Sequence, residues 1–260
     1  MVTAGIDLGA RTVKAVIMDG SKVLAKAITI TGFEQKQSAE EALNAALKQA
    51  GISRKDLAGL VATGVGRKVC LEPPISADRE VTEVTAAAMG AVSVHPAART
   101  VIDVGAEEGR ALRCDEKGAV KDFVINERCA AGAGTFVEAM ARALEVRLED
   151  MGPLALKSTR TIPMNAQCTV FAESEVVTLI HERTPKEDIA KAITDSMAAR
   201  IASMVRRVGI EKDVVLIGGV AKNVAFVEAL KKELATDIVV PPEPEYVGAL
   251  GAAQLAAKKE

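Results

Sequence analysis

The sequence predicts an α/β protein in which a strand-rich unit occurs twice and the two copies flank a ligand-binding cleft. The first observation is that Ile6-Asp7-Leu8-Gly9-Ala10 recurs, 96 residues later, as Ile102-Asp103-Val104-Gly105-Ala106. The second is that each copy leads through a tight turn into a returning strand that ends at another turn, Asp19-Gly20 in the first copy and residues 115–118 in the second. A period this long indicates duplication of one large unit rather than a solenoid repeat.

Composition sets the broad class. With 260 residues and 49% apolar residues, the chain can bury a large core as one large domain or two small ones. The 33 basic and 35 acidic residues are well mixed and give a net charge of -2, so no broad basic surface is expected. Aromatic residues make up 2% and Trp is absent, which leaves few stacking platforms for nucleic acid. We therefore expect no nucleic-acid partner.

The chain also lacks the pattern of a membrane protein. No run approaches the roughly 20 apolar residues that a spanning helix needs. The N-terminus enters directly into a strand-like segment without a signal-peptide pattern. We expect a cytoplasmic protein with no membrane partner.

The first unit is predicted over residues 1–98. Strands are expected within residues 5–20 on both sides of the first turn, and again over residues 22–31 and 57–63. Residues 38–50 predict a helix, because Ala39, Leu43, Ala46 and Leu47 recur at helical spacing and Gly51 follows as a stop. A helix of small residues is predicted over residues 81–89.

The second unit is predicted over residues 99–245, and residues 246–260 predict a C-terminal helix that returns to the first unit. After the repeated turn and the returning strand 110–114, a helix is expected over residues 135–146, where Phe136, Met140 and Leu144 share one face. Residues 213–217 predict a buried strand, followed by Gly218-Gly219 and a helix over residues 225–234.

The two repeated turns suggest a shared phosphate site. In each turn an Asp precedes a Gly at a strand end, where backbone N–H groups can reach phosphate and a carboxylate can hold Mg²⁺ through water. Two ordinary hairpins are the alternative, since Asp and Gly are common turn residues. The junction at Gly218-Gly219 would let a nucleotide lie close to the backbone, although many α/β proteins carry a glycine there.

Four cysteines fall into two groups. Cys129-Ala130-Ala131-Gly132-Ala133-Gly134 opens a predicted helix, and Cys168 precedes another helical run. We interpret Cys129 and Cys168 as half of an iron–sulfur site that a second subunit completes, with Gly132 and Gly134 keeping the approach to the helix N-terminus open. A zinc site of all four is the competing interpretation, but close pairs of the C-x₂₋₄-C type are lacking. Cys70 and Cys114 are predicted to be buried, inert thiols.

These motifs resemble a known superfamily. The Asp7 turn, the Asp103 turn and Gly218-Gly219 together resemble the phosphate and adenosine motifs of the actin, heat-shock ATPase and sugar kinase superfamily. Within it, residues 126–134 and 168–175 are similar to the ATP-dependent activators of 2-hydroxyacyl-CoA dehydratases and to the ATPase subunits of benzoyl-CoA reductase. This resemblance spans nearly the whole chain.

The resemblance implies a duplicated actin-like ATPase that binds ATP in its cleft and couples hydrolysis to delivery of a low-potential electron. It implies a homodimer, or a heterodimer with a paralogous ATPase subunit, that shares one [4Fe-4S] cluster at the subunit interface. Reduced ferredoxin or flavodoxin would be the donor, and an acyl-CoA dehydratase or reductase the acceptor.

The resemblance also assigns residues. Cys129 and Cys168 would ligate the cluster, and Asp7 and Asp103 would organise metal and water. Glu107 is a candidate catalytic base. The first phosphate loop would comprise Ala10, Arg11, Thr12, Val13 and Lys14. The second phosphate loop would comprise residues 103–107, with Gly105. The adenosine site would contain Gly218 and Gly219.

The chain departs from the family pattern in both loops. Activators usually show Gly-Gly-Gln-Asp where this chain has Gly105-Ala106-Glu107-Glu108, which is closer to a reductase ATPase subunit; residues 62–67 are more similar to the activators. The first loop lacks the usual serines and offers Thr12 and Lys14. Two other functions stay open, a small-molecule kinase of the same superfamily and an ATP-dependent regulatory module without a cluster.

Overall fold

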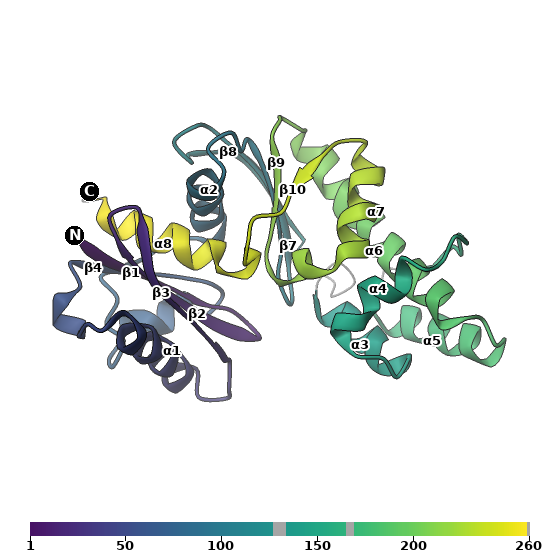
Figure 1. The fold of residues 1–260 in the computed structure, drawn as a ribbon, viewed down its shortest axis with the longest axis horizontal. Helices are drawn as coiled ribbons and strands as arrows, with labels where there is room; N and C mark the ends of the chain where they lie inside the picture. Colours follow the sequence, from purple (N-terminus) through teal and green to yellow (C-terminus); the bar gives the residue numbers. More distant parts are fainter. Residues whose placement is uncertain (127–133, 165–168, 259–260) are drawn as a thin grey trace.

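The computed structural model describes residues 1–126, 134–164 and 169–258 and contains two mixed five-stranded sheets (Figure 1). In the first sheet β1 pairs antiparallel with β2 and parallel with β4, so Asp7 lies opposite Lys14 on one side and Thr63 on the other. The strands in spatial order are β3 (Lys22–Ile30), β2 (Thr12–Asp19), β1 (Val2–Leu8), β4 (Gly59–Thr63) and β5 (Arg79–Glu80).

The second sheet repeats this arrangement. Its central strand pairs antiparallel with the next strand of the chain and parallel with a strand from much later, just as β1 does. The predicted duplication and α/β fold are therefore confirmed by topology. The strands in spatial order are β10 (Ile238–Val239), β9 (Val214–Ile217), β6 (Thr100–Val104), β7 (Gly109–Cys114) and β8 (Val120–Asn126).

Helix α1 (Gln35–Ala50) covers the first sheet and starts three residues before the predicted helix. Its apolar stripe, which includes Leu43 and Leu47, packs in one core with Ile6 and Leu8 of β1. The helix ends at Gly51, whose φ of 69° closes the last turn through hydrogen bonds to the carbonyls of residues 47 and 48.

Two helices are exchanged between the units. Helix α2 (Glu83–Val94) follows β5 of the first sheet but packs against the second, whereas α8 (Val247–Ala257) follows β10 of the second sheet and packs on β1 and β4. The helices cross closely: a Cβ on Gly90 would lie 2.0 Å from the Val247 carbonyl oxygen, and one on Gly251 would lie 1.9 Å from that of Ala86. Glycine at both positions lets this crossing join the two units.

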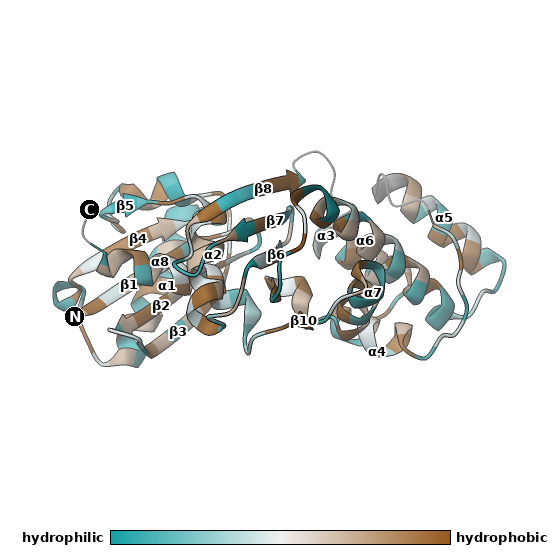
Figure 2. Ribbon diagram, turned by 90° about the horizontal axis from the view of Figure 1, so that it is seen from above, coloured by the Kyte–Doolittle hydropathy of each residue, from teal (hydrophilic) through white to brown (hydrophobic). Residues whose placement is uncertain are grey.

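The second unit carries an additional helical layer. Seen from above, the first sheet, the second sheet and these helices follow one another along the long axis (Figure 2). One large core joins the second sheet to these helices, and it includes Phe136, Met140, Ile193 and Phe226. The helices are α3 (Gly134–Ala143), α4 (Met151–Ala155), α5 (Thr169–His181), α6 (Lys186–Val208) and α7 (Val224–Leu234).

Short 3₁₀ segments complete the described chain. Those next to the cleft are η4 (Leu148–Asp150), η5 (Gly219–Lys222) and η6 (Pro244–Tyr246). A search of the described residues finds no helix with the length and apolar character that crossing a membrane requires.

Candidate nucleotide site

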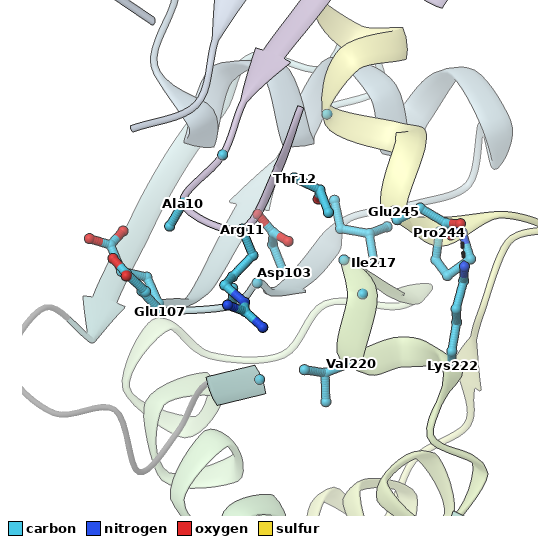
Figure 3. Close-up of a pocket in the computed structure, with 18 of the residues that line it drawn as sticks. Ala10, Arg11, Thr12, Asp103, Glu107, Ile217, Val220, Lys222, Pro244 and Glu245 are labelled. Atoms are coloured by element: carbon cyan, nitrogen blue, oxygen red, sulfur yellow. Dashed lines mark hydrogen bonds and ion pairs between the residues drawn. The ribbon is translucent and has the colours of Figure 1, made fainter. Parts of the chain in front are cut away.

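A cavity of about 460 Å³ lies between the two units, a volume typical of small-ligand sites. Both predicted phosphate turns and the Gly218-Gly219 junction line it, and Figure 3 shows Arg11, Asp103 and Glu107 around the same space. The cavity is therefore where the duplicated turns of the sequence meet.

The first turn is held by its backbone. The Gly9 N–H donates to the Thr12 carbonyl at 3.2 Å, and the Thr31 hydroxyl donates to the Gly9 carbonyl at 2.8 Å. Opposite the turn, Lys14 Nζ lies 3.2 Å from Asp7 Oδ2, as the β1–β2 register dictates. A carboxylate and a cation thus face the cavity from adjacent strands.

The second turn repeats this carboxylate–cation pair, with Arg110 in place of the lysine. Arg110 Nη1 lies 3.1 Å from Asp103 Oδ2, and Arg110 Nη2 lies 2.6 Å from both Glu83 Oε1 and Glu108 Oε2. The Arg110 side chain is only 7% exposed. Burial opposes its charge, but the three carboxylates outweigh burial and raise the pKa of Arg110. Burial raises the pKa of Asp103 and of Glu83, while Arg110 opposes both shifts.

Each Asp also meets a glycine from the neighbouring parallel strand. Gly64 follows β4 with φ of 93°, and a Cβ there would lie 2.6 Å from Asp7 Oδ1. Gly218 follows β9 with φ of 88°, and its Cβ would lie 2.7 Å from Asp103 Oδ1 and 2.4 Å from the Val104 carbonyl oxygen. Both positions therefore require glycine, for its positive φ and for the close approach.

Unpartnered polar atoms mark two further places in the cavity lining. Besides Arg110 Nε, the lining atoms that are buried without a hydrogen-bond partner among the described residues are Thr63 Oγ1 and Glu245 Oε2, although Glu245 Oε1 pairs with Lys222. Glu245 lies on the same side of the cavity as Ile217 and Lys222 (Figure 3). A buried acceptor without a partner is costly, and a ligand hydroxyl such as that of a ribose would satisfy it.

The lining is acidic overall. It contains eight acidic and four basic side chains, so an anionic ligand needs a cation to offset this excess. No group of three His, Cys, Asp or Glu residues that could hold a metal occurs in the described part of the chain. Asp7 and Asp103 fit the usual Mg²⁺ arrangement, in which one or two carboxylates act together with waters and substrate phosphates.

Most predicted site residues line this cavity. The structure brings together Asp7, Ala10, Arg11, Thr12, Lys14, Asp103, Gly105, Glu107, Gly134, Gly218 and Gly219. Val13 differs: its side chain is fully buried in the first core, because β2 alternates between core and cleft. Gly132, Cys129 and Cys168 lie outside the described residues.

The other two cysteines are structural. Cys70 is 0% and Cys114 is 2% exposed, which confirms the prediction of buried thiols. Burial raises the pKa of Cys70 to about 12 and that of Cys114 to about 11, so neither offers a thiolate at neutral pH.

The helices that follow the predicted cluster ligands in the sequence are neighbours in the fold. Cys129 lies five residues before the start of α3, and Cys168 lies one residue before the start of α5. The two helices contact each other, with Phe136 and Val137 of α3 in the same core as Ala172 and Val176 of α5.

Sequence reasoning missed several lining residues. Glu83 is at the first position of α2, and neither composition nor spacing indicated that α2 would cross to the second sheet. Gly64, which lies close to Asp7 without lining the cavity, could have been recognised, because Thr63-Gly64 at the end of β4 occupies the place of Ile217-Gly218 at the end of β9.

A duplicated α/β fold with two Asp turns around one cleft defines the class of two-unit, phosphate-binding proteins. The chain belongs to the BadF/BadG/BcrA/BcrD ATPase family, which matches residues 4–256. This confirms the predicted family and the prediction that the protein is an ATPase.

Named relatives match almost end to end. The activator of lactoyl-CoA dehydratase from Anaerotignum propionicum is 41% identical over 97% of this chain and 96% of its own length. One of the subunits of benzoyl-CoA reductase from Thauera aromatica is 33% identical over 97% of this chain and 92% of its own length. The structure of the activator of the 2-hydroxyisocaproyl-CoA dehydratase from Clostridium difficile with bound ADPNP superposes with a TM-score of 0.91, at 35% identity, over 98% of this chain and 94% of that one.

More distant structures show the fold alone. A ROK family glucokinase from Streptomyces griseus has a TM-score of 0.61 at 15% identity, and each chain is covered completely. The predicted actin-like and sugar-kinase-like fold class is thereby confirmed.

Proposed function

We propose that this protein is an ATP-hydrolysing iron–sulfur protein that delivers a low-potential electron to an acyl-CoA dehydratase or to an aromatic acyl-CoA (benzoyl-CoA) reductase. The observation that carries the proposal is the pairing of two equivalent Asp turns across one cavity in a chain whose relatives are named as dehydratase activators and a reductase subunit. One relative's structure holds ADPNP, which supports ATP as the ligand of the cavity.

The proposed site handles ATP by electrostatics rather than by a nucleophilic side chain. The cations Arg11 and Lys14 would bind the phosphates, and the buried Oε2 atom of Glu245 would accept from the ribose. Mg²⁺ held through Asp7 and Asp103 would offset negative charge on the phosphates and the acidic lining.

Water activation is proposed to involve acidic residues of the second turn. Glu107 lines the cavity from the loop after β6, and it remains the candidate base from sequence reasoning. Glu83, whose pKa is raised by burial, lines the same space from α2.

The cluster part of the proposal rests on Cys129 and Cys168. A [4Fe-4S] cluster takes four thiolates, so two chains would each supply these two across a two-fold axis. The partner chain would be a second copy or a paralogous ATPase subunit, with reduced ferredoxin or flavodoxin as the donor. The positive end of the α3 dipole would favour the anionic cluster.

Unit limits are proposed at residues 1–98, 99–245 and 246–260. Helix α8 lies on the first sheet, in agreement with the third limit, while α2 extends from the first unit onto the second sheet. Motion between the units would pass through the crossing of these helices at Gly90 and Gly251.

A small-molecule kinase is the alternative, favoured by the shared glucokinase fold. The test is anaerobic purification with iron and sulfide analysis, followed by an ATPase assay without any added small molecule. We expect about four irons per dimer and ATP hydrolysis, with iron lost in Cys129→Ser and Cys168→Ser but retained in the control Cys70→Ser. A colourless protein that hydrolyses ATP only with a sugar or acid acceptor would refute the proposal.

A further inference from the structure

Arg11 connects the first phosphate turn to the helical layer of the other unit. Arg11 Nη2 lies 2.7 Å from Glu138 Oε2 of α3, across the cavity that both side chains line. The Arg11 backbone is fixed, because its carbonyl accepts from the Thr31 N–H at 3.0 Å, while its side chain is 56% exposed. The turn is thus rigid, and the guanidinium at its tip is free to change partner.

Helix α3 is held from the opposite side by the second phosphate turn. The Gly134 N–H donates to the Gly105 carbonyl and the Thr135 N–H to the Ala106 carbonyl, both at 2.8 Å. One turn of helix further on, Glu138 binds Arg11. Both predicted phosphate loops therefore contact the first five residues of α3, which begins just after the segment that carries Cys129.

The ion pair between Arg11 and Glu138 is weaker than the neighbouring ion pairs of Lys14 and Arg110. Lys14 is 14% exposed beside Asp7, and Arg110 is 7% exposed among three carboxylates, so both ion pairs are better shielded from water than that of Arg11. Arg11 is half exposed and has Glu138 as its partner. Ion pairs between exposed groups contribute little, whereas a guanidinium binds phosphate oxygens in a bidentate and charge-assisted way.

We infer that Arg11 exchanges Glu138 for a phosphate of the bound nucleotide and thereby releases α3 from the first unit. The inference rests on the proposed function, because it requires a nucleotide in this cavity. Glu138 is 22% exposed and can be hydrated once its partner leaves. Arg11 is then a positioning residue that couples nucleotide binding to the placement of α3. Because α3 packs on α5, the change is passed on to both segments that precede these helices in the sequence.

The exchange is tested by titration calorimetry of the full-length protein with MgADPNP, using Glu138→Gln, Arg11→Gln and the double variant. Glu138→Gln frees Arg11, so we expect about two- to fivefold tighter binding than in wild type, the value of an exposed ion pair. Arg11→Gln loses the phosphate contact, and we expect binding at least about tenfold weaker. In the Arg11→Gln background, the Glu138 change should no longer improve binding.

Loss of negative charge alone would also improve binding of an anion, so a matched control is required. Glu149 lines the same cavity and pairs with Arg147, not with Arg11. Glu149→Gln should gain less than Glu138→Gln and should keep its gain in the Arg11→Gln background. If Arg11→Gln does not fold, as judged by its melting curve, Arg11→Lys replaces it, with an intermediate loss expected.

The outcomes separate this inference from the proposed function. An equal gain from Glu138→Gln with and without Arg11 would overturn the partner exchange while leaving nucleotide binding intact. Failure of the wild-type protein to bind MgADPNP would instead refute the proposed function.

Discussion

Arg110 lies directly opposite Asp103 on neighbouring antiparallel strands and binds its carboxylate at 3.1 Å. Lys14 and Asp7 have the same relationship in the first unit, at 3.2 Å. Duplication has therefore placed a carboxylate and a cation at both turns, but only Arg110 gathers two further carboxylates. This asymmetry makes the second turn the more tightly fixed half of the cavity.

Removing Arg110 should destabilise the fold strongly. Arg110→Met would leave Asp103, Glu83 and Glu108 close together without their shared cation, which we expect to cost about 3–5 kcal/mol of unfolding free energy. Urea denaturation measures the loss. Arg113→Met on the same strand is the control, because Arg113 pairs with exposed carboxylates and should cost under about 1 kcal/mol. Equal effects of the two changes would contradict this assignment.

The buried carboxyls should leave a pH signature. Burial raises the pKa of Glu83 and of Asp103, so the folded protein binds more protons than the unfolded chain. Their stabilising contribution is present below about pH 4, near the ordinary carboxyl pKa, and is lost as pH rises through the raised values. We expect wild type to lose stability relative to Glu83→Gln between about pH 4 and pH 7.

Urea unfolding at several pH values measures this difference, with the exposed Glu41→Gln of α1 as the control. A difference between wild type and Glu83→Gln that stays constant across the range would show that burial of Glu83 does not govern its ionisation.

Adjacent glycines should respond differently to alanine. Gly218→Ala forces φ of 88° on a residue with a Cβ 2.4 Å from the Val104 carbonyl oxygen, and should cost about 1–3 kcal/mol. A Cβ on Gly219 meets nothing within 4 Å and enters the cavity. Gly219→Ala should therefore keep the melting temperature and weaken nucleotide binding. Similar melting temperatures for both variants would contradict the geometry at Gly218.

The buried thiols of Cys70 and Cys114 should not react with an alkylating reagent in the native protein. Cys70 and Cys114 are buried, and their raised pKa values of about 12 and about 11 keep them protonated at pH 8. Alkylation of the native protein, mapped by peptide mass spectrometry, should leave both unmodified until urea unfolds the chain. Rapid native labelling of either one would show that its burial is not maintained in solution.

The sequence predicted the two turns that line the cavity better than it predicted the helices and short strands around them. The repeat of Asp7 as Asp103 located both turns, because a strand followed by a tight turn is a local signal. The exchange of α2 and α8 was not predictable in full, since the small-residue pattern of α2 shows no preference between two similar sheets. The two-residue strands β5 and β10 also escaped, because the pairing of such short strands depends on contacts distant in sequence. The long helix α6 was not predicted either, although its buried residues recur at helical spacing.

Individual side chains show the same limit. Val13 belongs to a phosphate-loop segment, yet strand alternation buries it in the core. Glu83 and Glu138 enter the cavity from helices whose docking depends on the whole core, so the spacing of residues along the chain gave no sign of either.

Coupling between the cavity and the proposed cluster is tested most directly by the rate at which a chelator removes iron. The measurement uses anaerobically purified protein with a coloured iron chelator, with and without MgADPNP. We expect different rates, because nucleotide binding would change how α3, the helix that follows Cys129 in the sequence, is held. Identical rates with and without nucleotide, in protein that binds both iron and MgADPNP, would contradict it.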